Sequence, residues 1–500
     1  MKDLLNSTVG TDSYPVTLVP PRGHVEGIVS LARFVQWGML TFAAVLLLIP
    51  FGTFAEFPPS LVIWVTATLL FLLTFYCFTV ARLSEENPWL TPASLLTSFY
   101  FFKYGWGALV VYHWNLLPWE VFPGIGDTFL YLGAKDFLPT SCQLILLAAC
   151  GLYFGAAGAM PVITPRLPVL NWRIDPAKFE LNLTLYVPLA LALFILARPF
   201  LPLVIRDTVL LFGWAVWVII VIGSYRVFTF HGRTKVKWVV LLVFTVLFHM
   251  VLGLHTGMRG NFLYPGLLIV LGYVIAKRRM PLKVLAIVLP AIIFMVVPIL
   301  TFYKSASVYG VQSVPDKLAL TVEQTVSADA QTFFEIGLDS VFGRLAGSSA
   351  GALPVFSQNF PDPYPFERGR SFVLELQQLI PRILWPDKPN INEELNRYTA
   401  SVGLLIEGGP TSQTFDAVSE YYLNFGLVGV FIFSFLHGYL YRVLYYWLVK
   451  RSHYEIGASI YIVFFSLNPD FVGVVLMFVS ATRQLLVWPL MLWLLSRQSV

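Results

Sequence analysis

The sequence is poor in cysteine and in charged residues. Its three cysteines, Cys77, Cys142 and Cys150, all fall within apolar stretches. They provide neither the cysteine framework of a small disulfide-stabilised protein nor the paired spacing of a structural zinc site. Charged residues make up 12% of the chain against 57% hydrophobic residues, roughly half the charged share of a soluble domain. A mean hydropathy of +0.72 therefore predicts a membrane protein.

Several motifs of common enzyme classes are also absent from the sequence. There is no Walker A loop, no HExxH element and no GxSxG element. The first thirty residues are polar and interrupted by Pro15, Pro20 and Pro21, so no cleavable signal peptide is expected. The net charge of +5 comes without a basic and aromatic module, so nucleic-acid binding is not expected.

Long apolar runs dominate what is present, and most are about long enough to cross ~30 Å of hydrocarbon. They lack barrel-like alternation, so helices are the expected spanning elements. We predict an all-α polytopic membrane protein with roughly 11 to 12 transmembrane helices. The runs lie near residues 33–51, 60–81, 94–117, 138–159, 181–197, 207–225, 236–255, 258–276, 283–302, 423–449, 455–467 and 471–495.

Basic residues gather in alternate short loops, which the positive-inside rule assigns to the cytoplasm. These residues are Arg166, Arg173, Lys178, Arg226, Arg233, Lys235, Lys237, Lys277, Arg278, Arg279, Lys283, Lys450 and Arg451. The predicted organisation is a cytoplasmic tail at 1–31, nine helices over 32–302, an external segment at 303–421 and the remaining helices over 422–500. Any chemistry in the external segment would proceed without cytosolic nucleotides.

The external segment is too long for an unstructured connection between packed helices. Residues 315–345 have the apolar spacing of a helix. A second, shorter amphipathic helix is predicted after Ser371, with Pro381 ending it. We expect both helices to lie along the membrane surface.

Five cations of this segment suggest a binding site for an anion. Guanidinium groups match the oxygens of a pyrophosphate in pairs, and a lysine adds a point charge. Alternatively, these cations pair with Glu367, Glu375, Asp387 and Glu393 or contact ordinary lipid headgroups. The cations are Arg344, Arg368, Arg370, Arg382 and Lys388.

Other ionisable residues fall in or beside the apolar runs. Arg259 begins one predicted helix and follows His255 by four positions, and Lys103 and Arg483 lie inside others. Such residues are candidates for function, although each could also extend its charged group to the membrane surface. Gly151, Gly155 and Gly158 have the small-residue spacing of close helix packing.

Three segments carry a resemblance to a known family: "HTGMRGNFL" at 255–263, "GRSFVLELQQLIPRILWPDKPN" at 369–390, and "TFDAVSEYYLNFGLVGVFIFSFLHGYLYR" at 414–442. The sequence resembles bacterial O-antigen polymerases of the oligosaccharide repeat-unit polymerase type. The resemblance implies a C-type glycosyltransferase in the bacterial cytoplasmic (inner) membrane. Its substrate would be an undecaprenyl-pyrophosphate-linked oligosaccharide, and a polysaccharide chain-length regulator would be a possible partner beside membrane lipid.

The implied reaction is attack of a sugar hydroxyl on the anomeric carbon of the growing chain, with undecaprenyl pyrophosphate as the leaving group. Cations that neutralise the leaving group suffice, so no cofactor and no metal are expected. Arg259, Arg370 and Arg382 are the leading candidates by match to the motifs, followed by Arg344 and Lys388. Glu420 is the first candidate for orienting or deprotonating the acceptor hydroxyl, followed by Asp416 and His255.

Two other functions fit the same residues. A ligase that moves finished glycan to another acceptor would need the same cations. A flippase for lipid-linked oligosaccharide would need a cation-lined path between both membrane faces. Glu420 also has a purely structural alternative, as a carboxylate that interacts with the dipole at a helix N-terminus.

Overall fold

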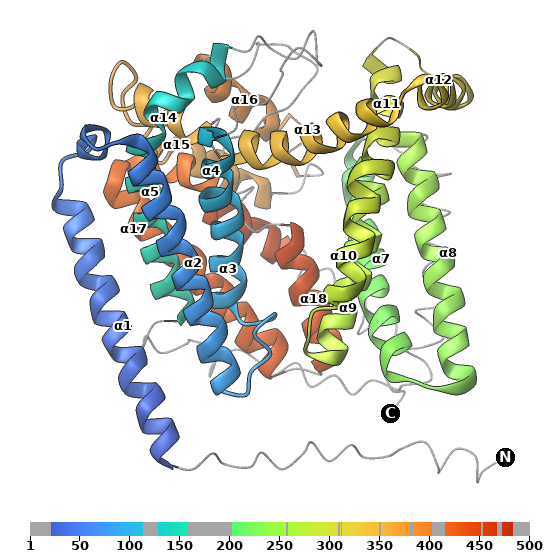
Figure 1. Cartoon of the computed structure of the whole chain (residues 1–500), viewed down its shortest axis with the longest axis horizontal. Coiled ribbons are helices and arrows are strands. Elements are labelled where there is room, and N and C mark those ends of the chain that lie inside the picture. Colours follow the sequence, from blue (N-terminus) through green and yellow to red (C-terminus); the bar gives the residue numbers. More distant parts are fainter. Residues whose placement is uncertain are drawn as a thin grey trace.

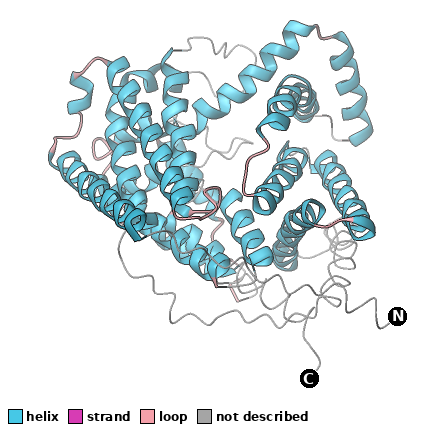
Figure 2. Cartoon of the chain, turned by 60° about the horizontal axis from the view of Figure 1, so that its bottom comes forward, coloured by secondary structure: helices cyan, strands magenta, loops and turns pink. Residues whose placement is uncertain are grey.

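The structure is a computed structural model. It describes residues 22–113, 129–157, 203–256, 259–308, 311, 313–349, 352–380, 384–385, 387–402, 416–451, 454–467 and 473–483. All regular structure in these ranges is helical, and they contain no strand (Figure 2). The all-α prediction is therefore confirmed for the described part of the chain.

The helices form two groups that are joined across one end (Figure 1). The first group comes from the N-terminal part of the chain together with α17. Its members are α1 (Arg22–Leu48), the 3-10 turn η1 (Thr53–Glu56), α2 (Pro59–Leu83), α3 (Pro92–Tyr100), the π-helix η2 (Phe101–Trp106), α4 (Gly107–His113), α5 (Phe129–Ala157) and α17 (Ala417–Leu444).

The second group comes from the middle of the chain. It contains α7 (Leu203–Thr229), α8 (Gly232–Thr256), α9 (Arg259–Lys277) and the nearly continuous rod of α10 (Leu282–Ala291), the π-helix η7 (Ile292–Val296) and α11 (Val297–Val308). After α17, the π-helix η9 (Tyr445–Lys450) leads to α18 (Tyr454–Leu467), which contacts α7 and α9. A last described helix covers Val474–Arg483.

The segment predicted to be external lies at the upper edge of the molecule in Figure 1. It contains α12 (Val314–Ser327), α13 (Ala330–Ser349), α14 (Ala352–Asn359), α15 (Arg370–Leu376), the 3-10 turn η8 (Gln377–Leu379) and α16 (Ile391–Ser401). Of these, α13 crosses from α4 in the first group to η7 and α11 in the second. The external segment therefore holds the two groups together.

Five described helical stretches are long and apolar enough to cross a membrane. They are Ser30–Leu48, Pro59–Leu83, Leu138–Ala157, Leu282–Ala306 and Ala417–Lys450. Every predicted apolar run overlaps a helix except 181–197, which lies outside the described residues.

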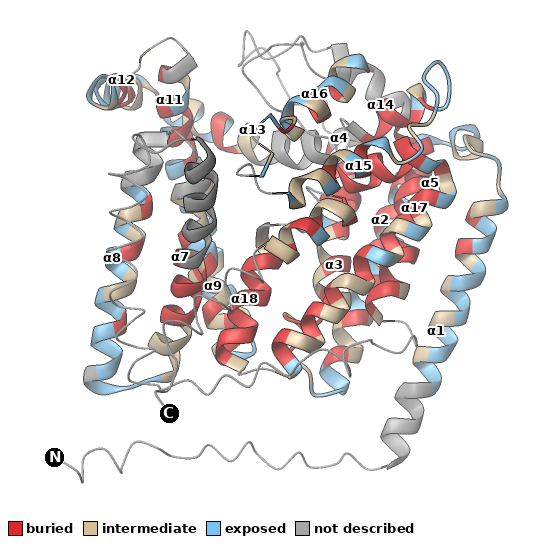
Figure 3. Cartoon of the chain, turned by 180° about the vertical axis from the view of Figure 1, so that it is seen from behind, coloured by how far each residue is buried: buried red, intermediate tan, exposed pale blue. Residues whose placement is uncertain are grey.

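Two of these stretches turn large apolar side chains outward. Phe34 is 76% exposed, Leu48 is 84% exposed and Ile287 is 76% exposed. Figure 3 shows the exposed positions of α1 over its coloured part. Exposed apolar surface on this scale suits contact with lipid.

The basic loops that the sequence grouped together meet at one end of the molecule. The basic turns α7–α8 and α9–α10 lie at the lower edge in Figure 1, together with the acidic α2–α3 turn and opposite α12 to α16. Ion pairs join the connection between η9 and α18 to its neighbours at this end. Lys450 Nζ lies 2.7 Å from Glu86 Oε1 of the α2–α3 turn, and Arg226 near the end of α7 pairs with Glu455 of α18. The basic loop at 166–178 lies outside the described residues.

Close packing of α5 on α17 forms the centre of the first group. A Cβ atom added at Gly155 would lie 2.5 Å from the amide nitrogen of Tyr439, and one at Gly438 would lie 2.9 Å from that of Ala156. The packing role predicted for Gly151 and Gly155 is therefore confirmed, whereas Gly158 lies outside the described residues.

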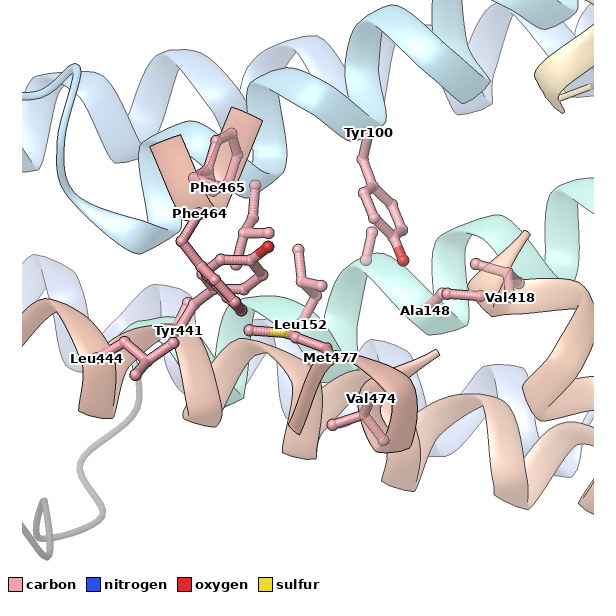
Figure 4. Packing of buried hydrophobic residues seen from close by; sticks show 14 of the residues in the cluster. Tyr100, Ala148, Leu152, Val418, Tyr441, Leu444, Phe464, Phe465, Val474 and Met477 are labelled. Carbon is pink, nitrogen blue, oxygen red and sulfur yellow. The ribbon is translucent and has the colours of Figure 1, made fainter. Parts of the chain in front are cut away.

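Buried aromatic residues complete the core around α17, α18 and the last helix. The ring of Tyr441 lies 5.3 Å from that of Phe465 and 6.0 Å from that of Phe464 (Figure 4). Figure 4 shows Met477 beside this cluster, and its side chain is fully buried. The last helix is therefore anchored against α17 by apolar contact.

The prediction of a single helix over 315–345 was wrong in one respect, because two helices cover this range. Asp329 separates them, since its carboxylate accepts hydrogen bonds from the Thr332 amide and hydroxyl at 2.8 and 2.7 Å and so caps α13. A capping carboxylate at this position competes with continuation of α12. The rings of Phe334 and Phe294 stack 5.0 Å apart and fix α13 against η7.

Candidate functional site

The site forms where the external segment meets a break in α17. Gly426 has φ 62° and ψ −151°, which is not a helical conformation. Leu423 and Asn424 therefore have backbone carbonyls that can accept bonds from elsewhere. These carbonyls accept hydrogen bonds from the amides of Glu367 and Arg368 at 3.0 and 3.1 Å. The external segment thereby replaces part of the helix's own bonding, as buried or membrane-embedded backbone requires.

We call the contact between the turn at 366–371 and the break in α17 the junction. Glycine is required on both sides of it. Gly369 precedes α15 with φ 91°, and Arg368 before it has φ 50°. A Cβ atom at Gly426 would lie 3.0 Å from the ring of Phe366. A side chain at either glycine would be strained, so these two residues permit the turn and the close approach of the two chains.

Asn424 connects the turn to α17 through all of its polar atoms. Its carbonyl oxygen accepts a hydrogen bond from the Gly369 amide at 2.8 Å. Its amide nitrogen donates to the Ser371 hydroxyl and to the Glu420 backbone carbonyl, each at 2.8 Å. The Ser371 hydroxyl then donates to Glu420 Oε1 at 2.6 Å. The result is a directed chain of bonds from the turn to a buried carboxyl group.

A second carboxyl group lies within hydrogen-bonding reach of Glu420. It belongs to Glu375, one turn after Ser371 in α15. Glu375 is 1% exposed and Glu420 is 2% exposed. Burial and the adjacent charge of Glu420 raise the pKa of Glu375 well above its usual range.

The carboxyl pair also joins the last described helix. Glu375 Oε2 accepts a hydrogen bond from the Leu476 amide at 2.9 Å, and the Tyr421 hydroxyl accepts one from the Val474 amide at 2.8 Å. Both amides belong to the first turn of that helix, where donors lack partners within the helix. A side chain at Gly473 would overlap Glu420 Oε2, so glycine is required there.

Asp416 begins α17 and meets a buried lysine. Its Oδ1 accepts a hydrogen bond from the Ser419 amide at 2.7 Å and caps the helix. Its Oδ2 lies 3.9 Å from Nζ of Lys103. Lys103 lies on η2 and is 5% exposed, with its ammonium group 4.8 Å from the ring centre of Tyr104. Lys103 therefore pairs with Asp416 in the interior.

Two arginines at the junction have solvent-exposed side chains. The side chains of Arg368 and Arg370 are exposed, and within the described part of the chain neither forms an ion pair or a side-chain hydrogen bond. Nearby acidic groups have other partners. Glu367 accepts from the Tyr398 hydroxyl at 3.3 Å, and Glu375 contacts Glu420. Within the described residues, the structure shows no ion pair between these two arginines and the carboxylates of the segment.

The remaining candidates are placed differently. Lys388 is buried, and its ammonium donates to the Ile380 carbonyl at 2.9 Å. Arg259 is the first residue of α9, His255 lies near the end of α8 and Arg344 lies within α13, but the side chains of these three lie outside the described set. Arg382 lies outside the described residues.

Sequence reasoning did not assign the polar face of α15 to the site. Ser371 and Glu375 share one face at i and i+4 and are buried, whereas Val373 and Leu376 are 56% and 43% exposed. This helix therefore buries the polar Ser371 and Glu375 beside Phe372 and exposes two apolar side chains. The available signal was the pairing of a serine and a glutamate at helical spacing opposite the apolar positions.

The sequence model of a family described as a domain of unknown function (DUF8712) matches residues 55–467. The match contains both segments of the junction. No curated protein and no solved structure matches the chain.

Proposed function

The chain belongs to the DUF8712 family, and we propose that it is a polytopic membrane glycosyltransferase that polymerises undecaprenyl-pyrophosphate-linked repeat units. It would act at the outer face of the bacterial cytoplasmic membrane, with the segment over 303–421 outside. The reaction is inferred from the resemblance to oligosaccharide repeat-unit polymerases. The geometry of the junction between α15 and α17 supports it.

One observation carries the proposal: Arg368 and Arg370 are exposed without carboxylate partners in the described part of the chain. Both lie on the turn that is bonded to α17, so their backbones are fixed. Two fixed guanidinium groups suit the oxygens of a pyrophosphate. This arrangement favours an anion-binding site over a surface ion-pair network.

The neighbouring surface suits a substrate with a lipid tail. Val373, Leu376 and Leu384 are 56%, 43% and 74% exposed, and they follow the two arginines in the sequence. An apolar surface beside cations is what a polyprenyl chain attached to a pyrophosphate would contact.

In the proposed reaction, the acceptor hydroxyl oxygen forms a bond to the anomeric carbon of the growing chain. The bond from that carbon to the pyrophosphate oxygen breaks, and the pyrophosphate leaves with the bonding electrons. Arg370 and Arg368 would stabilise this charge. The hydroxyl proton passes to solvent or to a base, and no metal or cofactor is needed.

Glu420 is enclosed, so in this arrangement it does not contact a substrate. Its bond to Ser371 makes it a positioning residue for the turn that presents Arg370. Asp416 is likewise occupied by Lys103 and the helix cap. Arg259 and Arg382 stay candidates for the pyrophosphate on the strength of the motifs.

The proposal is tested in a strain that lacks the gene and is complemented with wild type, Arg370→Ala, Arg370→Lys or Arg397→Ala at matched membrane levels. Arg397 is the control, because it is an exposed arginine of the same segment that already pairs with Glu394 at 3.0 Å. Surface and lipid-linked glycans are separated on gels.

We expect Arg370→Ala to lower long-chain glycan by about 100-fold and leave single repeats, since one lost charge-stabilising donor costs about this much in rate. Arg370→Lys should be intermediate, and Arg397→Ala should keep the ladder.

A ladder that persists in Arg370→Ala would refute the assigned site. If deletion leaves ladders on the carrier but none on the final acceptor, the protein is a ligase. Loss of all glycan from the outer face indicates a flippase.

A further inference from the structure

Among the described residues, no cation neutralises the contact between Glu375 and Glu420. Within the described chain, Glu420 is the only side chain that acts on the Glu375 carboxyl by charge or hydrogen bond. Glu420 accepts a hydrogen bond from the Ser371 hydroxyl and lies within hydrogen-bonding reach of Glu375. Two carboxylates in contact inside a protein cannot both be ionised, because like charges repel strongly where burial weakens solvent screening.

We propose that Glu375 and Glu420 share one proton. The singly protonated pair links α15, α17 and the helix over Val474–Arg483 through hydrogen bonds. Glu375 is thereby assigned as a positioning residue of the junction. The assignment rests on contacts and burial and does not depend on the reaction proposed above.

The hydrogen bonds indicate which carboxyl holds the proton. Glu420 Oε1 accepts from the Ser371 hydroxyl, so Glu420 is the acceptor and carries the negative charge. Glu375 Oε2 accepts from the Leu476 amide, which leaves its other oxygen to carry the proton and donate it to Glu420. The single negative charge lies beside the N-terminus of the last helix, where the helix dipole stabilises it.

The charged and titratable groups on each surrounding element have other partners or lie at the surface. On α17, Asp416 pairs with Lys103 of η2, and the Tyr421 hydroxyl bonds to His437. On the turn before α15, Glu367 accepts from Tyr398, and Arg368 and Arg370 are exposed. The last helix contributes Arg483 at its far end. Within the described part of the chain, no other group neutralises the pair, which favours a proton held between the two carboxyls.

Shared protonation has a defined consequence for stability. Folding raises the pKa of Glu375 above its ordinary value of 4.5, so the folded state holds a proton that the unfolded state releases. The contribution of the pair is complete below about pH 4.5 and declines as the pH rises toward the folded pKa. Glutamine at this position imitates the protonated acid at every pH and removes the decline.

The test uses purified full-length wild type, Glu375→Gln, Glu420→Gln and Glu394→Gln without substrate. Glu394 is the control, since it pairs with exposed Arg397 outside the junction. Infrared spectra at neutral pH should show a protonated carboxylic acid band in wild type and in Glu394→Gln. Both Glu375→Gln and Glu420→Gln should lose that band, because the remaining carboxylate then accepts from a glutamine amide.

Unfolding from about pH 5 to about pH 9 gives the second measurement. Relative to Glu375→Gln, wild type should lose up to about tenfold in its folded-to-unfolded ratio per pH unit until the folded pKa is passed. Absence of the band from wild type, or equal pH dependence of wild type and Glu375→Gln, would overturn the shared proton. Neither result bears on glycan polymerisation, so the two proposals fail separately.

Discussion

At the residue scale, the polar groups of the junction between α15 and α17 form a matched set. Asn424 uses each of its polar atoms, and the Ser371 hydroxyl accepts one bond and donates another. An unpaired polar group at such positions would cost about 1 to 3 kcal/mol. The junction is therefore specific, because replacing one member leaves a partner buried without a bond.

Asp416 combines a helix cap with an ion pair, and two substitutions separate these roles. Asp416→Asn keeps the oxygen that caps α17 but removes the charge facing Lys103. We expect it to destabilise the protein by about 3 kcal/mol, because the lysine is left buried without its counter-ion. Asp416→Ala should cost about 1 kcal/mol more through the lost cap.

The measurement is the midpoint of unfolding in detergent, with Lys103→Met and Lys103→Met/Asp416→Asn as partners in a cycle. The double variant should recover part of the loss, since no unpaired charge remains. Strictly additive losses would show that the two groups do not interact.

At the element scale, α5 and α17 approach closely because glycines face each other across the contact. A Cβ atom at Gly151 would lie 3.1 Å from the Phe435 amide nitrogen and 3.2 Å from the Ser434 side chain. Small residues allow such contact between helices in lipid, where hydrophobic burial gives little driving force. The two helices carry Glu420 and the core that supports it, so their spacing determines the junction.

Gly155→Val should separate α5 from α17, because its side chain would meet the backbone of Tyr439 and Gly438. Backbone cannot yield as a flexible side chain does, so we expect a loss of about 3 kcal/mol or more in unfolding free energy. Gly266→Val is the control, since no atom lies within 4 Å of a Cβ atom there. Thermal unfolding of the two variants is the comparison, and equal midpoints would contradict the packing.

At the scale of the whole molecule, the basic turns and the external segment lie at opposite ends (Figure 1). Exposed apolar side chains lie on the helices between them. The positive-inside rule predicts that the basic end is cytoplasmic. The chain would then present Arg370 on the side where no nucleotide is present.

This orientation is tested with introduced cysteines, because the three native cysteines are buried. Asp362→Cys and Arg279→Cys lie at exposed positions of the two ends. A membrane-impermeant maleimide applied to intact cells should label the first variant, and the second only after permeabilisation. The reverse pattern would place the external segment in the cytoplasm and rule out the proposed reaction.

The apolar runs determined the all-helical class and the helix positions, since length and hydropathy act locally along the chain. Gly151 and Gly155 also indicated their packing role. The break between α12 and α13 was missed because the capping bonds of Asp329 compete with an apolar pattern that continues across it. Periodicity reports which face is apolar and does not report where capping interrupts a helix.

From the sequence by itself, Arg370 became a candidate through its match to the motifs of the family that the chain resembles, and Glu420 through its place beside another of these motifs. Only the tertiary structure decided that these segments bond to each other, that Glu375 contacts Glu420, and that Arg368 and Arg370 face outward without carboxylate partners in the described chain. The physical reason is distance in the sequence. The bonds between Ser371 and Glu420 and between Glu375 and Leu476 join residues 49 and 101 positions apart, and no local pattern encodes such contacts.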